Sequence, residues 1–160
     1  MNKQEICDYL NEKDIWYEIV SHKEVFNMKE LSTINLPYKD SDAKNLFVCD
    51  DKKNYYLITV KGSKKVDLKK FKEYNNTRHL SFANEGELLD ILNLKPGSVT
   101  PFGLFNDKNL KVKFYIDENF EDDTIIGVHP NENTATVWLK TKDLICLIQQ
   151  HGNEIHRISI

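Results

Sequence analysis

Two apolar runs of six residues, separated by five polar residues, are the feature that most constrains the fold of this chain. Residues 44–49 read KNLFVC, and residues 55–60 read YYLITV. The segment between them, DDKKN, is short and polar. Runs of this length that are rich in β-branched and aromatic residues, and bounded by turn formers, are typical of strands. The pattern therefore predicts a β-hairpin in the middle of the chain.

A second hairpin is predicted over residues 125–139, which read IIGVHPNENTATVWL. Its first apolar run stops at His129 and Pro130, and alternation of apolar and polar residues resumes at Thr134. A tight hairpin turn needs only two residues such as Asn-Gly. The histidine, the proline and two asparagines in this turn therefore call for a further explanation.

Helical and extended patterns surround these hairpins. Amphipathic or capped patterns predict helices over residues 2–13, 25–34, 66–74, 84–92 and 141–150. Further strands are predicted over residues 15–20, 112–116 and 155–158, and residues 80–83 look extended. Residues 94–107 contain two prolines and two glycines, so they are predicted to form a shaped loop. The mixture favours one α+β domain over residues 1–160, with a mixed, largely antiparallel sheet flanked by helices.

Composition is ordinary for a globular domain, with 40% hydrophobic and 29% charged residues. No apolar stretch approaches the roughly 20 residues that cross a bilayer, and the polar start lacks a secretory signal. We therefore expect a cytoplasmic protein that does not bind membranes. The three cysteines, Cys7, Cys49 and Cys146, form no C-x-x-C pair, and we expect Cys49 and Cys146 to be small buried residues.

Charge is unevenly distributed although the net charge is only −3. Residues 61–72 hold six lysines and one acid, whereas residues 117–123 hold five acids and no base. A basic face on an acidic protein can still meet a phosphate backbone. Solvation is the default interpretation of both runs.

The usual catalytic and metal-binding signatures are absent. There is no G-x-G-x-x-G, P-loop, G-x-S-x-G or H-E-x-x-H motif, and the five histidines show no ligand spacing. We therefore predict neither a metal nor a cofactor. Three features remain: Lys44 at the start of an apolar strand, the loop at residues 97–101, and His129 at a strand end. Taken singly, each has a structural explanation, as an edge charge, a turn or a surface residue.

Together, these three features resemble the YbaK/ProX family of free-standing aminoacyl-tRNA deacylases, relatives of the editing domain of bacterial prolyl-tRNA synthetases. The resemblance spans nearly the whole chain and follows one order: lysine before an apolar strand, then G-x-x-x-P, then H-P-x-x-N before a strand. It implies a mixed sheet curved into a partial barrel. The H-P-N-x-N-T pattern, which starts at His129, resembles the ProX branch, which removes alanine from proline tRNA.

The resemblance implies hydrolysis of the ester between an amino acid and the tRNA 3′-terminal ribose. The implied catalytic set is Lys44, Gly97, Ser98, Val99, Thr100, Pro101 and His129. Backbone N–H groups of the loop would hold the carbonyl region, and Lys44 would bind a phosphate near the tRNA 3′ end. The ribose 2′-hydroxyl would help to activate water, so no protein nucleophile is needed.

Binding of the substrate is assigned to Lys44, His129, Asn131 and Asn133, and binding of tRNA to Lys61, Lys64, Lys65 and Lys69. Proline tRNA is the expected partner, and prolyl-tRNA synthetase is the candidate protein partner. Specificity for alanine would come from a pocket too small for larger side chains. Three alternatives remain: a Cys-tRNA(Pro) deacylase of the YbaK branch, a tRNA- or synthetase-binding module without catalysis, and a small-molecule binding protein.

Overall fold

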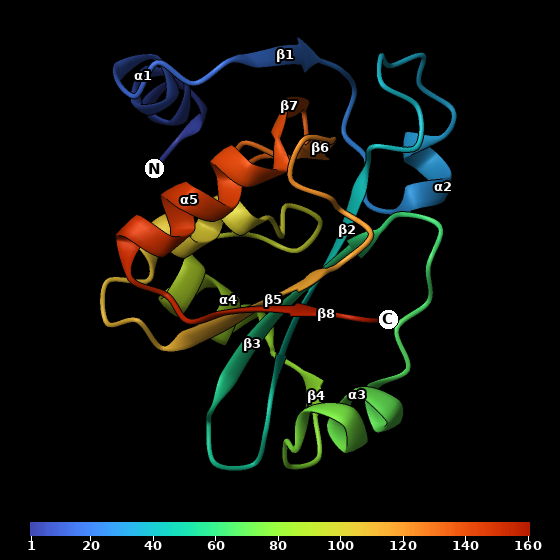
Figure 1. Cartoon of the computed structure of the whole chain (residues 1–160), viewed down its shortest axis with the longest axis vertical. Helices are drawn as coiled ribbons and strands as arrows, with labels where there is room; N and C mark the ends of the chain where they lie inside the picture. The colour runs from blue at the N-terminus through green and yellow to red at the C-terminus, as the bar shows by residue number, and fades with distance from the viewer.

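The computed structural model describes residues 1–160, which form two β-sheets flanked by helices (Figure 1). The helices are α1 (Lys3–Glu12), α2 (Met28–Leu31), α3 (Leu68–Asn75), α4 (Glu85–Leu92), α5 (Thr141–His151) and the 3-10 helix η1 (Pro101–Asn106). The strands are β1 (Tyr17–Ser21), β2 (Ala43–Cys49), β3 (Tyr55–Lys61), β4 (Ser81–Phe82), β5 (Val112–Asp117), β6 (Ile125–Val128), β7 (Ala135–Lys140) and β8 (Ile155–Ile158). No helix combines the length and the apolar character needed to span a bilayer.

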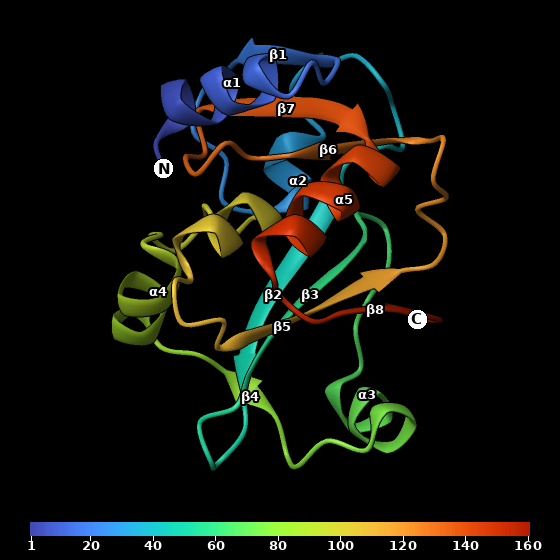
Figure 2. The ribbon, with the colours of Figure 1, turned by 60° about the vertical axis from the view of Figure 1, so that its left-hand side comes forward.

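The smaller sheet has the order β1-β7-β6, and both of its pairings are antiparallel. It contains the predicted second hairpin, in which Val128 pairs with Val137. Figure 2 shows this sheet at the top of the molecule, beside α1.

The larger sheet has the order β4-β2-β3-β5-β8. The predicted central hairpin pairs β2 with β3 in antiparallel fashion, from Ala43 opposite Lys61 to Cys49 opposite Tyr55. The pairings β3–β5 and β5–β8 are parallel. The α+β class with a mixed, largely antiparallel sheet is therefore confirmed, although the strands form two sheets and no closed barrel.

The two sheets meet where β2 begins. An isolated parallel bridge joins Asp42 to Gly127 of β6, and the Gly127 N–H donates to the Ser41 carbonyl at 2.8 Å. On the other side, the Gly62 N–H donates to the Asp42 carbonyl at 2.9 Å. The start of β2 is thus held between β6 and the end of β3, and this junction positions the candidate site.

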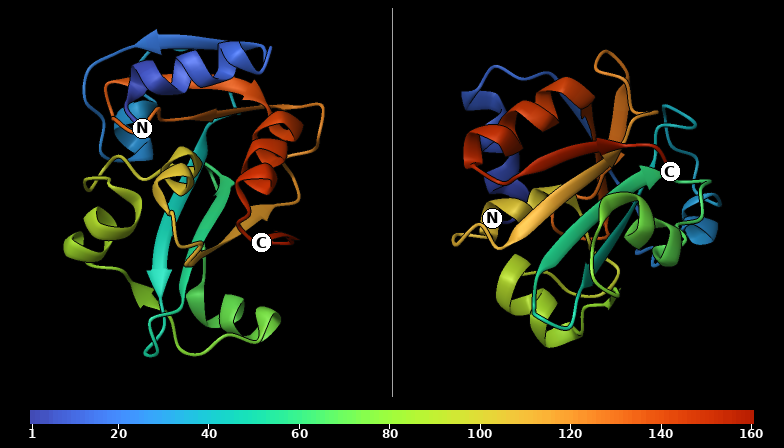
Figure 3. Two further views of the ribbon diagram at one scale, coloured as in Figure 1. Left: turned by 90° about the vertical axis from the view of Figure 1, so that its left-hand side faces the viewer. Right: turned by 60° about the horizontal axis from the view of Figure 1, so that its bottom comes forward.

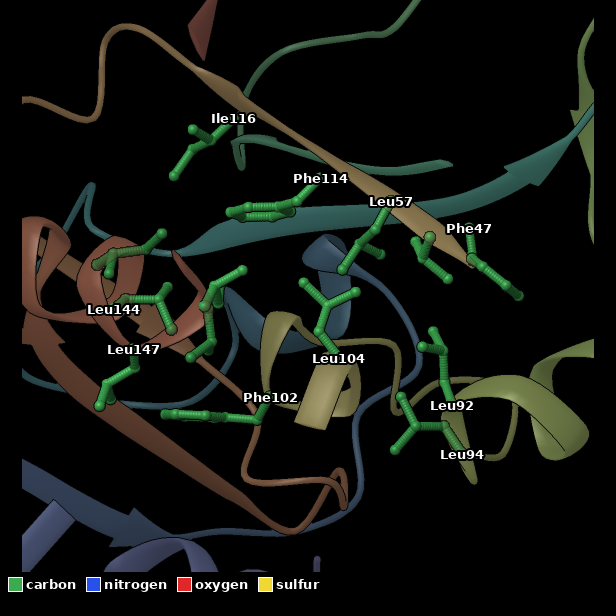
Figure 4. Close-up of a cluster of buried hydrophobic side chains, with 14 of the residues drawn as sticks. Phe47, Leu57, Leu92, Leu94, Phe102, Leu104, Phe114, Ile116, Leu144 and Leu147 are labelled. Atoms are coloured by element: carbon green, nitrogen blue, oxygen red, sulfur yellow. The ribbon is translucent and has the colours of Figure 1, made fainter. Parts of the chain in front are cut away.

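The main core fills the space between the sheets, α4, η1 and α5 (Figure 4). Leu57 and Phe114 come from the central strands, and they point toward Phe102 of η1 and Leu144 of α5. All four of these side chains are fully buried. Burial of one such side chain stabilises the fold by about 1.5–3 kcal/mol. A smaller cluster around Phe71 packs α3 on the other face of the larger sheet, at the end remote from α1 (Figures 1 and 3).

Several predicted helix ends are confirmed. Asn84 and Glu87 form the predicted capping box of α4, in which each side chain accepts a hydrogen bond from the other residue's backbone N–H. Gly152 follows α5 with φ +115°, a left-handed conformation that glycine adopts at little cost. The predicted shaped loop contains η1, which begins at Pro101.

Three expectations from sequence are wrong. The helix predicted over residues 25–34 covers only α2, because the Asn27 side chain caps the Glu30 N–H and the Val25 N–H donates to the Asn133 carbonyl. Cys146 is exposed on α5, whereas Cys49 is buried as predicted. Asp117 is fully buried, although the acidic run that contains it was expected to be solvated.

Candidate active site

A cavity of about 480 Å³ lies at the junction of the two sheets. Its walls come from the start of β2, the loop after β3, the segment around α2, the loop at residues 97–99 and the end of β6. Lys44, Gly97, Val99 and His129 all line it. The structure therefore brings the three sequence features, which lie far apart in the chain, to one hollow.

The loop at residues 97–101 presents only part of its length to the cavity. Gly97 and Val99 line it, whereas Ser98, Thr100 and Pro101 are buried behind them. Neither Gly97 nor Val99 uses its backbone N–H in a hydrogen bond within the protein. These two free donors on the cavity wall are of the kind that stabilises a developing oxyanion.

Gly97 is required at its position for two reasons. Its φ is +85°, a region in which side chains other than glycine are strained. A Cβ atom there would also lie only 2.6 Å from Cδ1 of Phe26. The phenylalanine ring therefore packs directly against the loop, although Phe26 as a residue is 58% exposed; it also lines the cavity.

His129 is held as a neutral imidazole. Its Nδ1 lies 3.0 Å from the Ala135 carbonyl oxygen, which can only accept, so Nδ1 carries the proton. Burial lowers the pKa of His129 below its usual value, and the neighbouring His22, whose ring centroid is 6.3 Å away, lowers it further. Nε2 is left as an acceptor without a partner in the protein.

The hairpin asparagines do not line the cavity. Asn133 is buried, and its Nδ2 donates to the Val25 carbonyl at 3.0 Å. Asn131 adopts φ +62°, and its Nδ2 donates to the Met1 carbonyl at 2.7 Å. These contacts tie the turn to two N-terminal segments, which explains the asparagines by their structural role.

The lysines predicted to bind tRNA lie in different settings. Lys64 and Lys65 line the cavity, and Lys61 lines a neighbouring hollow with its Nζ 4.3 Å from the centre of the Phe120 ring. Lys69 is exposed on α3, outside both hollows. Lys44 Nζ donates to the Lys64 carbonyl at 3.3 Å, which holds its ammonium beside the loop after β3.

Lys64 is already engaged within the protein. Its Nζ lies 2.9 Å from Oδ2 of the buried Asp117 and donates to the Ile160 carbonyl at 2.9 Å. Asp117 also accepts from the backbone N–H groups of Lys61 and Asn119. The basic and acidic runs of the sequence therefore meet in a structural ion pair. Lys65, which is exposed and forms no ion pair, is freer than Lys64 to bind a ligand.

Among the cavity-lining residues that the sequence analysis did not single out, Phe26 and Asp42 carry side chains suited to contact a ligand. Phe26 was assigned to the helix predicted over residues 25–34, but it lies before the start of α2. Asp42 lies two residues before Lys44, and side chains two apart along a strand share a face. That spacing marks Asp42 only once β2 is known to begin at Ala43, because the apolar run in the sequence starts after Lys44.

The loop at residues 97–101 presents no hydroxyl nucleophile to the cavity. A hydroxyl that does line the cavity, that of Thr136, lies 2.9 Å from Nε2 of His22. Ser98 is buried away from the cavity wall, and Thr100 donates its hydroxyl to the His129 carbonyl at 2.6 Å. No group of three His, Cys, Asp or Glu side chains is placed to hold a metal ion. What the cavity offers is a cation, free backbone donors and a neutral acceptor, which suits the hydrolysis of an already activated ester by water.

Comparisons with known proteins define the family of proteins to which the chain belongs. The sequence profile of the aminoacyl-tRNA editing domain matches residues 22–147. A trans-editing enzyme candidate for prolyl tRNA synthetase, known as a crystal structure, superposes with a TM-score of 0.69 at 17% identity, covering 99% of this chain and 96% of that one. That similarity extends the shared fold over the whole chain.

Relatives of known sequence indicate the branch of the family that this chain resembles. Prolyl-tRNA editing protein ProX of Acetoanaerobium sticklandii is 35% identical over 159 residues, covering 99% of this chain and 97% of the relative. Prolyl-tRNA synthetase associated domain-containing protein 1 of Mus musculus is 32% identical, covering 86% of this chain and 83% of the relative. A proline–tRNA ligase of Staphylococcus saprophyticus is 29% identical over 83% of this chain, which corresponds to 23% of the ligase.

The chain belongs to the aminoacyl-tRNA editing domain family, and it resembles the ProX branch along almost its full length. The predicted family resemblance is confirmed, as is the predicted enzyme class, an aminoacyl-tRNA deacylase.

Proposed function

We propose that this protein is a trans-editing hydrolase that removes alanine from mischarged Ala-tRNA(Pro). The observation that carries the proposal is the single cavity in which Lys44, the free N–H groups of Gly97 and Val99, and the neutral imidazole of His129 meet. The relative named prolyl-tRNA editing protein ProX, at 35% identity, supports proline tRNA as the carrier.

In the proposed reaction, water attacks the ester carbon and the bond to the ribose oxygen breaks. The carbonyl oxygen becomes an oxyanion in the transition state, and the N–H groups of Gly97 and Val99 hydrogen-bond to it. The proton lost by water ends on the ribose oxygen, so the products are alanine and tRNA with a free 3′-hydroxyl. The activated ester needs orientation more than a strong nucleophile.

His129 and Lys44 orient the tRNA end in this scheme. Nε2 of His129 accepts a hydrogen bond from a ribose hydroxyl, which fixes the sugar and the attacking water. The Lys44 ammonium binds a phosphate near the 3′ end as a compact point charge. Phe26 offers an exposed aromatic face at the same cavity, on which the terminal base stacks.

Selection of alanine rests on the apolar part of the wall. Val25, Leu31 and Val128 are buried and line the cavity. A cavity of about 480 Å³ holds more than an alanyl group, so the ribose fills part of it and size selection acts on what is left. One methylene is worth only about 1–3 kcal/mol, so glycine and serine esters are also expected to be cleaved to some degree.

A deacylation panel tests the proposal. Purified protein is incubated separately with Ala-tRNA(Pro), Cys-tRNA(Pro) and Pro-tRNA(Pro), and release of each amino acid is followed. Release of alanine alone is the expected result. Preferential release of cysteine would move the protein to the YbaK branch, and tRNA binding without any release would identify a binding module. Co-purification with prolyl-tRNA synthetase tests the protein partner.

A further inference from the structure

The carboxylate of Asp42 is an unpaired acid on the cavity wall. Its Oδ1 is buried and has no hydrogen-bond partner, and the side chain forms no ion pair. Burial is the main influence on the pKa of Asp42 and raises it; the acid Asp40 raises this pKa further, and the base His22 lowers it. One oxygen of this carboxylate is therefore removed from water without a hydrogen bond, although the residue as a whole is only half-buried.

Backbone contacts to both neighbouring strands hold Asp42 in place. The backbone of Asp42 forms a β-bridge with Gly127, and its backbone carbonyl accepts from the Gly62 N–H. The end of β3 and strand β6 therefore fix the position of Asp42 from both sides. A Cβ at Gly127 would lie 3.2 Å from Oδ1 of Asp42 and 2.7 Å from Nε1 of Trp138, which is also buried without a partner. Protein groups therefore surround Asp42, but none of them forms an ion pair with it or donates a hydrogen bond to Oδ1.

A buried carboxylate costs several kcal/mol unless a cation or hydrogen-bond donors compensate it. Three lysines line the cavity, and none of them forms an ion pair with Asp42: Lys44 and Lys64 bond to other partners, and Lys65 is exposed. A bound molecule can therefore supply the compensation. The substrate under the proposed function carries such a group, since every aminoacyl ester has a free α-ammonium next to its carbonyl carbon.

We propose that Asp42 binds the α-ammonium group of the aminoacyl ester and so restricts the site to esters of unblocked amino acids. This inference rests on the proposed function and adds a recognition element to it. Asp42 and Lys44 lie on one strand face with opposite charge: the acid takes the amino acid end, and the lysine takes the phosphate end. The ester bond is oriented between these two charges.

The test compares three esters on the same proline tRNA: alanyl, lactyl and N-acetylalanyl. In the lactyl ester a hydroxyl replaces the ammonium at nearly constant size, and acetylation removes the charge. Each kcat/KM is divided by the rate of spontaneous hydrolysis of the same ester, because the ammonium also activates the carbonyl. For the wild type, we expect the alanyl ester to be favoured about 10- to 100-fold over the lactyl ester.

Asp42→Asn provides the second arm, with Asp40→Asn as the matched control. Asp40 is an exposed acid two residues away, so its substitution removes a nearby charge without touching the buried carboxylate. Asp42→Asn is expected to lower kcat/KM for the alanyl ester about 10- to 100-fold and to leave the lactyl ester within about twofold. Asp40→Asn is expected to keep the wild-type preference.

The outcomes separate this inference from the proposed function. Equal loss of the alanyl and lactyl activities in Asp42→Asn would mean that the carboxylate acts through the fold, and it would overturn the inference while hydrolysis stands. Absence of preference in the wild type would overturn it even if the variant does not fold. Failure of the wild type to cleave any of the three esters would overturn the proposed function itself.

Discussion

The Thr100 hydroxyl donates a 2.6 Å hydrogen bond to the carbonyl oxygen of His129. This bond joins the loop at residues 97–101 to the residue that follows β6, so it links the loop that carries the free N–H groups of Gly97 and Val99 to the backbone of His129. Thr100 also accepts weakly from the Phe102 N–H at 3.4 Å, which fixes the start of η1. One buried side chain thus connects two parts of the site that lie 29 residues apart in sequence.

Thr100→Val tests that connection, because valine keeps the shape and removes the hydroxyl. The His129 carbonyl would lose a buried donor, and we expect unfolding free energy to fall by about 1–2 kcal/mol. We expect kcat/KM for Ala-tRNA(Pro) to fall about tenfold through misalignment of the loop. The control is Thr124→Val, which removes a similar 2.7 Å bond to the Glu121 carbonyl on the surface. Equal effects from both variants would contradict the positioning role.

Gly97→Ala tests the backbone geometry of the loop. The left-handed conformation alone is expected to cost about 1–2 kcal/mol, and the clash with Phe26 adds to it. In a Phe26→Ala background, only the conformational part should remain, so the two costs can be measured separately by denaturant unfolding. Identical losses in both backgrounds would show that the ring does not press on the loop.

Phe26→Ala tests base stacking at the cavity. Loss of one stacking contact is expected to weaken tRNA binding by about 1–3 kcal/mol, with little change in stability because the ring is mostly exposed. Phe82→Ala is the matched control, since Phe82 is 64% exposed on β4 and lines neither hollow. Affinity for tRNA is measured by fluorescence anisotropy, and equal affinities for the two variants would exclude stacking on Phe26.

The pH dependence of stability follows from His129. Burial lowers its pKa in the folded state below the ordinary value of 6.5, so the unfolded chain binds the proton more readily. The stability that depends on neutral His129 is fully present above pH 6.5, and it is lost as the pH falls through the folded-state pKa. We therefore expect the melting temperature of the wild type to decrease between pH 6.5 and 5, relative to that of His129→Asn. Parallel curves for the two proteins would contradict the assignment.

We predict that Lys64 has a structural role and that Lys65 and Lys69 face the tRNA. Lys64→Ala leaves the buried Asp117 carboxylate without its ion-pair partner, and we expect it to lower unfolding free energy by ~3 kcal/mol. Lys65→Ala combined with Lys69→Ala should leave stability unchanged and reduce the salt slope of tRNA binding by about 1.5. Binding measured between 50 and 200 mM salt checks this, and an unchanged slope would remove both lysines from the interface.

Local patterns predicted the fold well where one segment determines its own structure. The β2–β3 hairpin, the Asn84 capping box of α4 and the Gly152 end of α5 depend on residues close in sequence. The predicted helix over residues 25–34 failed because long-range bonds to Asn133 hold its start extended. Periodicity within a segment contains no information about such partners.

In the candidate site, too, residues marked by local sequence patterns were predicted, and residues that depend on distant contacts were not. Lys44, Gly97 and His129 stand at recognisable strand ends and turns, so sequence patterns single them out. Asp42 and Phe26 become candidates only through burial and exposure, which depend on how the two sheets meet. Asp117 was predicted to be solvated because its partner, Lys64, comes from the distant loop after β3 and is not visible in the local pattern.

The most direct test of the account is the single-turnover rate of alanine release from Ala-tRNA(Pro) by the wild type, Lys44→Ala and His129→Asn. Lys142→Ala, which alters a surface ion pair with Asp123, serves as the control. The account predicts a loss of about 100-fold or more for each cavity variant, with the control unchanged. Wild-type rates for both Lys44→Ala and His129→Asn would contradict it.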